Sequence, residues 1–472
     1  MNLREKGIAL VTVLLVGVCL FLFTAAAVIV AQNAMRHARK QANETKVQYV
    51  AEAGLERALA NLAQNSSWLN LDQGDPNFND VPFQRGIFDV DPIIVDGSDR
   101  IVTSHGYIPT KANPLAELTV RARVTPVPLA FRHALFSAGE FEGEGSAGTI
   151  ARGSLFASKG YTQNFNRFVF DTTAAKANQY FIETPSNQVA QSLLSDYGPY
   201  VRSGSQVNDI SLPDIDYLEL TNPGNFPGQD VYMLTPPTID HPEGSLWTEG
   251  GKYYYALGPS SDKGENKLYL DIALINSTLG GTSETGSIVA VDFASYFDSY
   301  QRMEDELVIT NPGGLRGGLA TTSSSIVAYA SQGGTATRDC GAVIQVTGAD
   351  VTFAPRNRFA LVGGDINIIN TSGTVKIGTP TFPAIAFGTS TLQGSGTVDL
   401  WPGTYRGEQG HIEIYGSIVS SSDVATIHGK GNGTSVTIWY DERVLDSQAS
   451  GFQKALIGGD CYLERKSIAR IR

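Results

Sequence analysis

The sequence predicts an α+β protein in which a long N-terminal helix and a small antiparallel sheet precede a large all-β domain. Residues 8–31 carry no charge, helical spacing continues to about residue 64, and beyond residue 125 short apolar runs alternate with turn residues. The 472 residues exceed the size at which one core usually stops growing, so several units are expected. With 50 glycines and only 17% charged residues, the composition is that of a folded, turn-rich chain.

The apolar run of residues 8–31 is long enough to cross a membrane. As a helix it spans roughly 36 Å at about 1.5 Å per residue, more than the roughly 30 Å of a hydrocarbon core. A cleaved secretion signal would have an apolar region of about 7 to 15 residues, whereas the small-residue site at Ala25-Ala26-Ala27 lies about 17 residues into this run. The charges on the two flanks do not settle its orientation.

Residues 32–64 continue the same helix with a different surface. Leu55, Ala58, Leu59 and Leu62 fall at the spacing of one helical face, and no proline interrupts the segment. The cluster Asn65-Ser66-Ser67 competes with helical hydrogen bonds and predicts the helix end. The first half of the helix therefore suits lipid or a bundle, and the second half suits packing on a globular head.

The N-terminal region resembles PilX-type minor pilins. The resemblance rests on Lys6-Gly7, the following Ile8-Ala9-Leu10-Val11-Thr12, and AEAGLERALANL at residues 51–62. It implies that prepilin peptidase cleaves between Gly7 and Ile8 at the cytoplasmic face, and that the new N-terminus at Ile8 is methylated. Glycine suits such a site because a residue without Cβ lets an enzyme reach the backbone beside an emerging helix.

Thr12 occupies the position at which major pilins carry a glutamate. A carboxylate in lipid is costly unless it is paired, and in a pilus it can pair with a neighbouring N-terminal amine. Thr12 cannot supply that charge, so the resemblance indicates a tip or initiating subunit. PilX-type proteins and the K-type pseudopilins of type II secretion share this absence, while a simpler interpretation is a hydroxyl that bonds back along its helix.

Residues 65–130 are predicted to form the head sheet. Strand-like stretches occur at residues 86–95, 99–108 and 116–124, and the last alternates apolar and polar positions cleanly. The predicted organisation is thus a leader at 1–7, a membrane half of the helix at 8–31, its amphipathic half at 32–64 and this head.

Residues 131–472 are predicted to form a large β domain. Runs such as AVIQV, FALV, INII and AIAF recur at uneven spacing after residue 341, with Gly, Asn, Asp or Ser between them. A sandwich or a β-solenoid fits this rhythm, and the shortness of the runs favours an irregular solenoid. The domain order resembles competence pilin-like proteins with a β-solenoid set into the pilin sheet, which implies a place at the tip of a DNA-uptake pilus.

The formal charge of −12 means that nucleic-acid binding requires a local basic patch. Basic residues interleaved with aromatic rings are candidates for such a patch, because nucleic-acid grooves combine cations with stacking rings. Basic residues also protect strand edges from pairing, and that simpler interpretation is weighted more heavily. The candidates are Arg316, Arg356, Arg358, Lys376 and Arg406.

Two cysteines lie outside the apolar run, Cys340 and Cys461, and they form either a disulfide or two buried thiols. The chain has no phosphate-loop or nucleophile-elbow motif, and its six histidines lack ligand spacing. We therefore expect a protein that is not an enzyme, with no metal and no cofactor.

Together these features predict a minor pilin or pseudopilin that begins as a single-pass inner-membrane precursor and reaches the cell surface at a pilus tip. Its expected partners are other minor and major pilins, prepilin peptidase, the membrane before assembly, and DNA. Two alternatives remain: a type II secretion pseudopilin, and a membrane-anchored polysaccharide-active protein.

Overall fold

The computed structural model describes most of the chain. The described residues are 3–69, 77–96, 99–145, 148–161, 167–173, 180–260, 266–281, 286–300, 303–311, 320–331, 341–348, 350–370, 372–403, 408–422, 424–429, 433–445 and 450–471. Only the backbone is described for residues 3–11, 143–145, 424–426, 429, 445, 450 and 471.

The chain divides into two compact units. The first comprises Met1–Asn61, Trp68–Val124 and Arg465–Arg472, and the second comprises Leu62–Ser67 and Thr125–Glu464. The sequence predicts a single large domain for residues 131–472. The structure differs because the last eight residues, Arg465–Arg472, belong to the first unit.

Helix α1 (Leu3–Gln64) begins the first unit and is 62 residues long. It ends at the predicted cluster, where the Asn65 Oδ1 accepts a hydrogen bond from the Ser67 amide at 3.0 Å. This local bond replaces the next helical bond, as expected for asparagine. The single helix spanning both halves of the N-terminal region is therefore confirmed.

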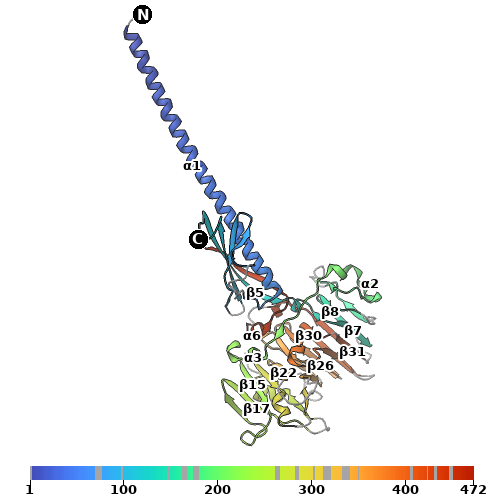
Figure 1. The fold of residues 1–472 in the computed structure, drawn as a ribbon. Helices are drawn as coiled ribbons and strands as arrows, with labels where there is room; N and C mark the ends of the chain where they lie inside the picture. The colour runs from blue at the N-terminus through green and yellow to red at the C-terminus, as the bar shows by residue number, and fades with distance from the viewer. Residues whose placement is uncertain are drawn as a thin grey trace. The chain divides into compact units, whose positions relative to one another are not determined.

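The sheet of the first unit includes the C-terminal strand, drawn in red in Figure 1, and its strands β1 to β5 pair in antiparallel fashion. Within the described residues its strands run in the order β1-β2-β4-β5-β34, with β3 paired to β4. They are β1 (Val81–Phe83), β2 (Gly86–Val90), β3 (Ile94–Asp96), β4 (Asp99–Ile108), β5 (Ala116–Pro128) and β34 (Cys461–Ile471). The strands predicted for the head are confirmed; β34 was not foreseen.

Two glycines let the second half of α1 approach this sheet closely. A Cβ on Gly54 would lie 2.7 Å from Cδ2 of Phe88, and would also meet the Ser104 hydroxyl. A Cβ on Gly106 of β4 would lie 2.7 Å from the Val47 carbonyl oxygen of the helix. Such distances are too short for a methyl group, so the helix packs directly on the side chains of Phe88 and Ser104 at Gly54, and helix and strand meet backbone to backbone at Gly106. Gly54 is the glycine of the AEAG stretch, so close packing of the helix on the sheet explains why this position of the motif is a glycine.

Ion pairs attach β34 to the rest of the first unit. Lys466 Nζ lies 2.9 Å from Oδ1 of Asp99, whose side chain is 6% exposed, and Arg465 Nη2 lies 2.8 Å from Oε2 of Glu56. Asp99 also accepts a bond from Arg123 Nε at 2.5 Å. The basic C-terminal segment is thus a paired strand of the sheet, and its charges face carboxylates of α1 and β4.

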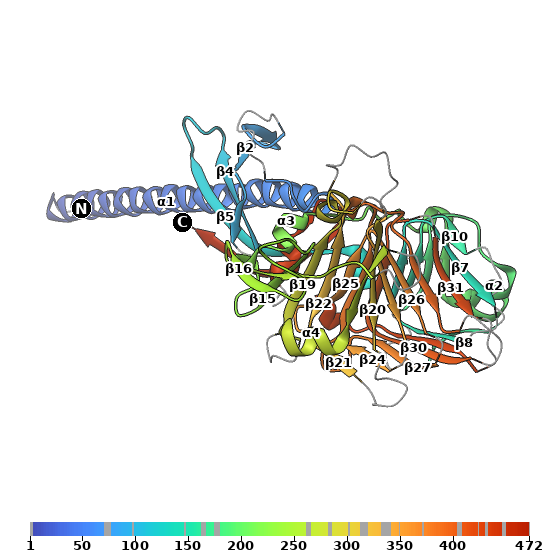
Figure 2. The same ribbon diagram turned by 90° about the horizontal axis from the view of Figure 1, so that it is seen from below.

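The second unit consists of stacked coils whose strands form three ladders (Figure 2), in which the pairing is parallel except between β16 (Leu246–Glu249) and β17 (Lys252–Ala256) at one end of the third ladder. Equivalent strands of successive coils pair in parallel, as in β23 (Val343–Thr347) with β26 (Asp365–Ile369), and β26 with β29 (Val398–Trp401). This differs from a sandwich, whose strands pair in antiparallel fashion. The second and third ladders are joined because the long strand β30 (Gln409–Ser420) takes part in both.

The strands of each ladder follow one another in space in an order that differs from the sequence. Ladder 1 contains β18 (Asn266–Asp271), β20 (Met303–Thr310), β23 (Val343–Thr347), β26 (Asp365–Ile369), β29 (Val398–Trp401), β31 (Val424–Gly429), β7 (Glu140–Gly145) and β10 (Gly160–Tyr161). Ladder 2 contains β21 (Ala320–Thr322), β24 (Val351–Phe353), β27 (Ser372–Ile377), β30 (Gln409–Ser420), β32 (Ser435–Trp439), β8 (Gly148–Arg152) and β11 (Phe168–Phe170). Ladder 3 contains β16 (Leu246–Glu249), β17 (Lys252–Ala256), β15 (Asp230–Thr235), β19 (Ser287–Asp292), β22 (Ser325–Tyr329), β25 (Phe359–Gly363), β28 (Ala384–Gly388), β30, β6 (Leu135–Ser137), β9 (Leu155–Ala157), β12 (Ile182–Thr184) and β13 (Val201–Ser203).

The first and last coils in the sequence meet in the middle of the stack. β6 pairs with β30, β7 with β31 and β8 with β32, all in parallel. In Figure 2 the red β31 accordingly lies beside the blue-green β7. We call this junction the seam. On both sides of the seam, successive coils are added in the same direction along the stack. The stack is therefore continuous, although the order of its coils is circularly permuted relative to the sequence.

The interior is filled by aliphatic side chains in register. Leu307, Ile344, Ile366 and Val398 lie opposite one another on neighbouring strands of ladder 1 and are buried. The central strands of ladder 3, such as β25 and β28, are buried on both faces, because a second cluster that includes Phe131 and Phe452 covers their outer side. Strands buried on both faces read as continuous apolar runs, which explains FALV and AIAF in the sequence.

Shorter elements complete the second unit. The antiparallel pair β14 (Asp214–Ile215) and β33 (Leu456–Ile457) brings distant segments together. The helices of the described residues are α2 (Gln191–Tyr197), α3 (Tyr217–Leu220), α4 (Ile272–Thr278), α5 (Ala294–Phe297) and α6 (Ser450–Lys454), and the 3-10 turn η1 (Leu129–Arg132) follows β5.

The close approach at Gly54 leads to a test. Gly54→Ala is expected to lower the free energy of unfolding of the first unit by about 1–3 kcal/mol, because the methyl group overpacks the contact with Phe88. The matched control is Gly17→Ala in the same helix, where no atom lies within 4 Å of the position that the added methyl group would take. Hydrogen exchange of the β4 amides in the full-length protein measures the difference; equal protection in both variants would contradict the packing role.

Candidate functional site

The first candidate site is the apolar half of α1. The described helix from Thr12 is long and apolar enough to span a membrane by length and composition, and none of its most apolar window is buried. Phe21 and Phe23 are 73% and 75% exposed. Exposed apolar surface of this extent is a site for lipid or for other helices.

Three positions predicted from the sequence lie on this helix. The backbone at Gly7 and Ile8 belongs to α1, but their side chains lie outside the described residues, so the predicted cleavage site remains a prediction. Thr12 is exposed on the helix surface. The absence of a carboxylate at this position therefore leaves an exposed hydroxyl-bearing side chain within the apolar half.

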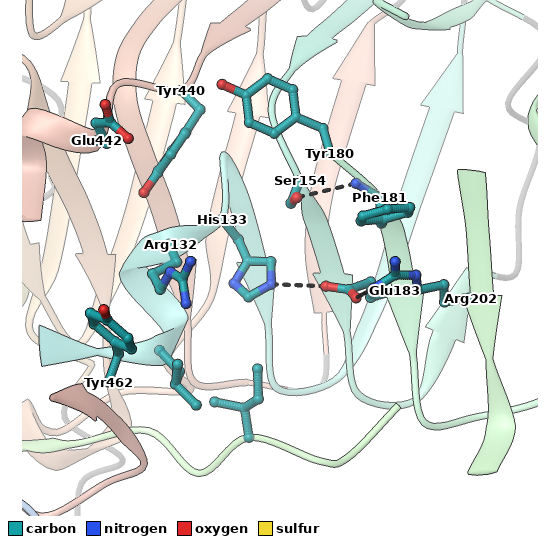
Figure 3. A pocket seen from close by; sticks show the side chains of 12 residues that line it. Arg132, His133, Ser154, Tyr180, Phe181, Glu183, Arg202, Tyr440, Glu442 and Tyr462 are labelled. Atoms are coloured by element: carbon teal, nitrogen blue, oxygen red, sulfur yellow. Dashed lines mark hydrogen bonds and ion pairs between the residues drawn. The ribbon is translucent and has the colours of Figure 1, made fainter. Parts of the chain in front are cut away.

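The second candidate site is a pocket of the second unit with a volume of about 580 Å³. It opens beside η1 and is shown in Figure 3. Its charged or ionisable lining residues are Arg132, His133, Glu183, Arg202 and Glu442. The others are Leu129, Ser154, Tyr180, Phe181, Ile210, Tyr440 and Tyr462.

A network of a buried histidine, a partly buried glutamate and an exposed arginine forms one wall of the pocket. His133 Nε2 lies 3.5 Å from Oε2 of Glu183, and Arg202 Nη1 lies 3.4 Å from Oε1 of the same carboxylate (Figure 3). Burial raises the pKa of Glu183, but the hydrogen bond from His133 and the charge of Arg202 outweigh it, so the pKa is lowered overall. The Arg202 guanidinium also lies 3.3 Å from the ring centroid of Phe181. Glu183 is therefore held as a carboxylate whose charge is already compensated.

The opposite wall carries phenols and a second arginine. The Tyr180 and Tyr440 rings meet edge to face at 6.4 Å, and the Arg132 guanidinium lies 5.1 Å from the ring centroid of Tyr462. Burial raises the pKa of Tyr440, and the nearby charge of Arg132 only partly opposes this. The Tyr440 phenol is therefore neutral at pH 7 and able to donate a hydrogen bond.

The basic residues proposed for nucleic-acid binding have different surroundings. Arg316 and Arg406 lie outside the described residues. Arg356 is exposed, with its guanidinium 5.3 Å from the ring centroid of Phe382. Arg358 is half-buried and contributes to lowering the pKa of Asp441.

Lys376, the remaining candidate, is engaged within the protein. Its Nζ lies 2.8 Å from Oε2 of Glu413 on the neighbouring strand, and this hydrogen bond raises the pKa of Lys376. Its charge is thus compensated, whereas Arg356 presents its charge at the surface.

The predicted cysteine pair is described at one end only. Cys340 lies outside the described residues, while Cys461 is buried with its Sγ 3.1 Å from the carbonyl oxygen of Leu62. A disulfide and two buried thiols therefore both remain predictions.

Sequence reasoning missed the pocket because its walls come from several distant segments. Arg132 and His133 follow β5, Glu183 lies on β12, Tyr440 follows β32, and Tyr462 lies on β34. No spacing pattern connects these residues. The one available signal was the tyrosine and glutamate content around residues 440–442, which is not distinctive alone.

Comparison with protein families finds no matching family, and no curated protein sequence matches the chain. Among solved structures, the chain is similar to the crystal structure of the competence-associated pilin ComZ from Thermus thermophilus. The identity is 13%, the match covers 91% of this chain and 98% of that chain, and the TM-score is 0.30.

The Glu183 network leads to a prediction about acid stability. Because the folded-state pKa of Glu183 is lowered, its contribution to stability is full above the unfolded pKa of about 4.3 and is lost as pH falls through the folded value. Glu183→Gln should therefore be less stable than wild type near neutral pH, and the difference should shrink below about pH 4.

Chemical unfolding of the full-length protein at several pH values measures this difference. Glu249→Gln, which removes an exposed carboxylate at the end of β16, is the control and should keep the wild-type dependence on pH. A constant difference between Glu183→Gln and wild type across the acid range would contradict the assignment.

Proposed function

We propose that the chain is a non-enzymatic minor pilin or pseudopilin of a type IV pilus-like machine, placed at the tip of the assembly. The observation that carries the proposal is the division of α1 into an apolar, exposed half and a half that packs on the sheet of the first unit. A helix of this kind can lie in a membrane before assembly and among other subunits' helices afterwards.

The contact at Gly54 supports the same proposal. The AEAG stretch that resembles PilX-type minor pilins is the stretch at which Gly54 of α1 packs on the Phe88 ring of β2, and at which the backbone of Ala51 approaches Gly106 of β4. The resemblance therefore corresponds to a defined packing requirement. Prepilin peptidase would process the chain between Gly7 and Ile8, and other pilins would be its partners.

Placement at the tip rests on size and on Thr12. A second unit spanning Thr125–Glu464 on a single subunit would obstruct lateral stacking in a shaft, unless it projected from the end. Thr12 offers no carboxylate to pair with a neighbouring N-terminal amine, so this subunit does not need the charge pairing of a shaft subunit.

Within this role, DNA uptake is the activity that the sequence resemblance favours. Of the predicted contacts, the exposed Arg356 is the one best placed to meet a phosphate, since Lys376 is paired with Glu413. A pseudopilin of type II secretion would share the features of α1. The DNA-uptake pilus and the type II secretion machine are therefore distinguished by the phenotype of a deletion strain.

Processing of the leader is the first test. Mass spectrometry of the N-terminal peptide should find Ile8 as the first residue, with an added methyl group, in protein from the native host. Gly7→Val should leave the leader attached, because the side chain hinders access to the backbone. Gly17→Val, in the same helix, should be processed normally, and an intact Met1 in the wild type would contradict the proposal.

Placement and machine are tested in a deletion strain complemented with an epitope-tagged chain. Labelling should appear at the ends of isolated pili, and labelling along the shaft would exclude the tip. Loss of transformation with normal enzyme secretion would support a DNA-uptake pilus. Loss of secretion with normal transformation and piliation would instead identify a type II secretion pseudopilin.

A further inference from the structure

The pocket beside η1 is not required for the assembly role proposed above. It lies wholly within the second unit, and its volume of about 580 Å³ is within the range of roughly 300–1,000 Å³ typical of small-ligand sites. Its lining residues show which class of ligand it can accept.

The charges of the lining residues do not favour a polyanion. Among the described lining residues, Arg132 and Arg202 are balanced by Glu183 and Glu442. Arg202 is already committed to Glu183 at 3.4 Å and to the ring of Phe181. A nucleic acid or polyacid would need an excess of positive charge, which this pocket lacks.

An apolar ligand is equally unfavourable. It would remove the Tyr440 hydroxyl and the exposed Arg132 from water without offering them hydrogen bonds. Desolvating such groups without a hydrogen-bond partner is unfavourable. The ligand must therefore present both donors and acceptors while carrying little net charge.

The aromatic rings complete the description. Tyr180, Tyr440 and Tyr462 line the pocket together with Phe181, and each combines an apolar ring with a polar edge or a neighbouring cation. A sugar ring has an apolar C–H face that packs on such rings and hydroxyl groups around its rim.

We propose that this pocket binds a short, uncharged saccharide. Arg132 donates to ligand oxygens, the Glu442 carboxylate accepts from ligand hydroxyls, and Tyr440, kept neutral by its surroundings, donates or accepts. The C–H face of the sugar packs on the phenol rings. The proposal concerns binding only, and it goes beyond the assembly role because it does not depend on α1.

Calorimetric titration of the full-length protein with maltotriose and with the trisaccharide of N-acetylglucosamine tests this binding. The protein is kept in a zwitterionic detergent without a sugar headgroup, because a maltoside headgroup could occupy the pocket. At least one trisaccharide should bind, and Arg132→Ala should weaken it about tenfold, the equivalent of about 1.4 kcal/mol.

Tyr440→Phe keeps the ring and removes the hydroxyl, so it should weaken binding severalfold while the fold is retained. Arg356→Ala removes another exposed arginine that stacks on an aromatic ring, and it should leave the affinity unchanged. Affinity should also change little between about 50 mM and about 500 mM salt, because the ligand is uncharged.

Three results would overturn the proposal. One is failure of both trisaccharides to bind, and another is equal binding in wild type, Arg132→Ala and Tyr440→Phe. The third is tighter, salt-dependent binding of trigalacturonate or of a short oligonucleotide that is lost in Arg132→Ala, which would identify an anion site. None of these results bears on leader processing or pilus labelling, so the assembly role is tested separately.

Discussion

The fold of the second unit depends on one constraint: the segment that forms this unit must begin and end at the same place. The Leu129 amide donates to the Asp460 carbonyl at 3.0 Å, so a hydrogen bond joins the two ends of the inserted segment. The constraint arises in the sheet of the first unit, where β5 and β34 are neighbours. A simple stack of coils cannot satisfy it, because each coil adds about 4.8 Å and the two ends move apart.

The circularly permuted order resolves this conflict. The chain enters the stack at β6, in its middle, builds the coils on one side, and later returns from the far end until β30 meets β6. Ser417 Oγ donates to the His133 carbonyl oxygen at 2.6 Å across a sequence separation of 284 residues. The backbone groups at the seam are thus paired as in the rest of the ladder, and the entry and exit points lie together without an exposed break in the stack.

Local patterns in the sequence predicted the elements well and their pairing poorly. The apolar run, the helical face at Leu55 and the Asn65 stop signal each act over a few residues, so helix α1 and its end followed directly. The strands FALV and AIAF could also be located, because burial on both faces gives continuous apolar runs. The assignment of β34 failed for a physical reason: Lys466 is paired with the buried Asp99, a contact between residues 367 positions apart that leaves no local pattern.

The same reasoning explains why the pocket could not be predicted and why it lies where it does. Inside the stack, residues such as Ile344 and Ile366 repeat in register and fill the core, which leaves no room for a ligand. On the outer face of ladder 3, the paired residues Glu183 and Arg202 of β12 and β13 lie beside η1 and β34, and there side chains from several segments face one another. Arg132, Tyr440 and Tyr462 meet only because entry and exit coincide, so the constraint that closes the fold also creates this polar cavity.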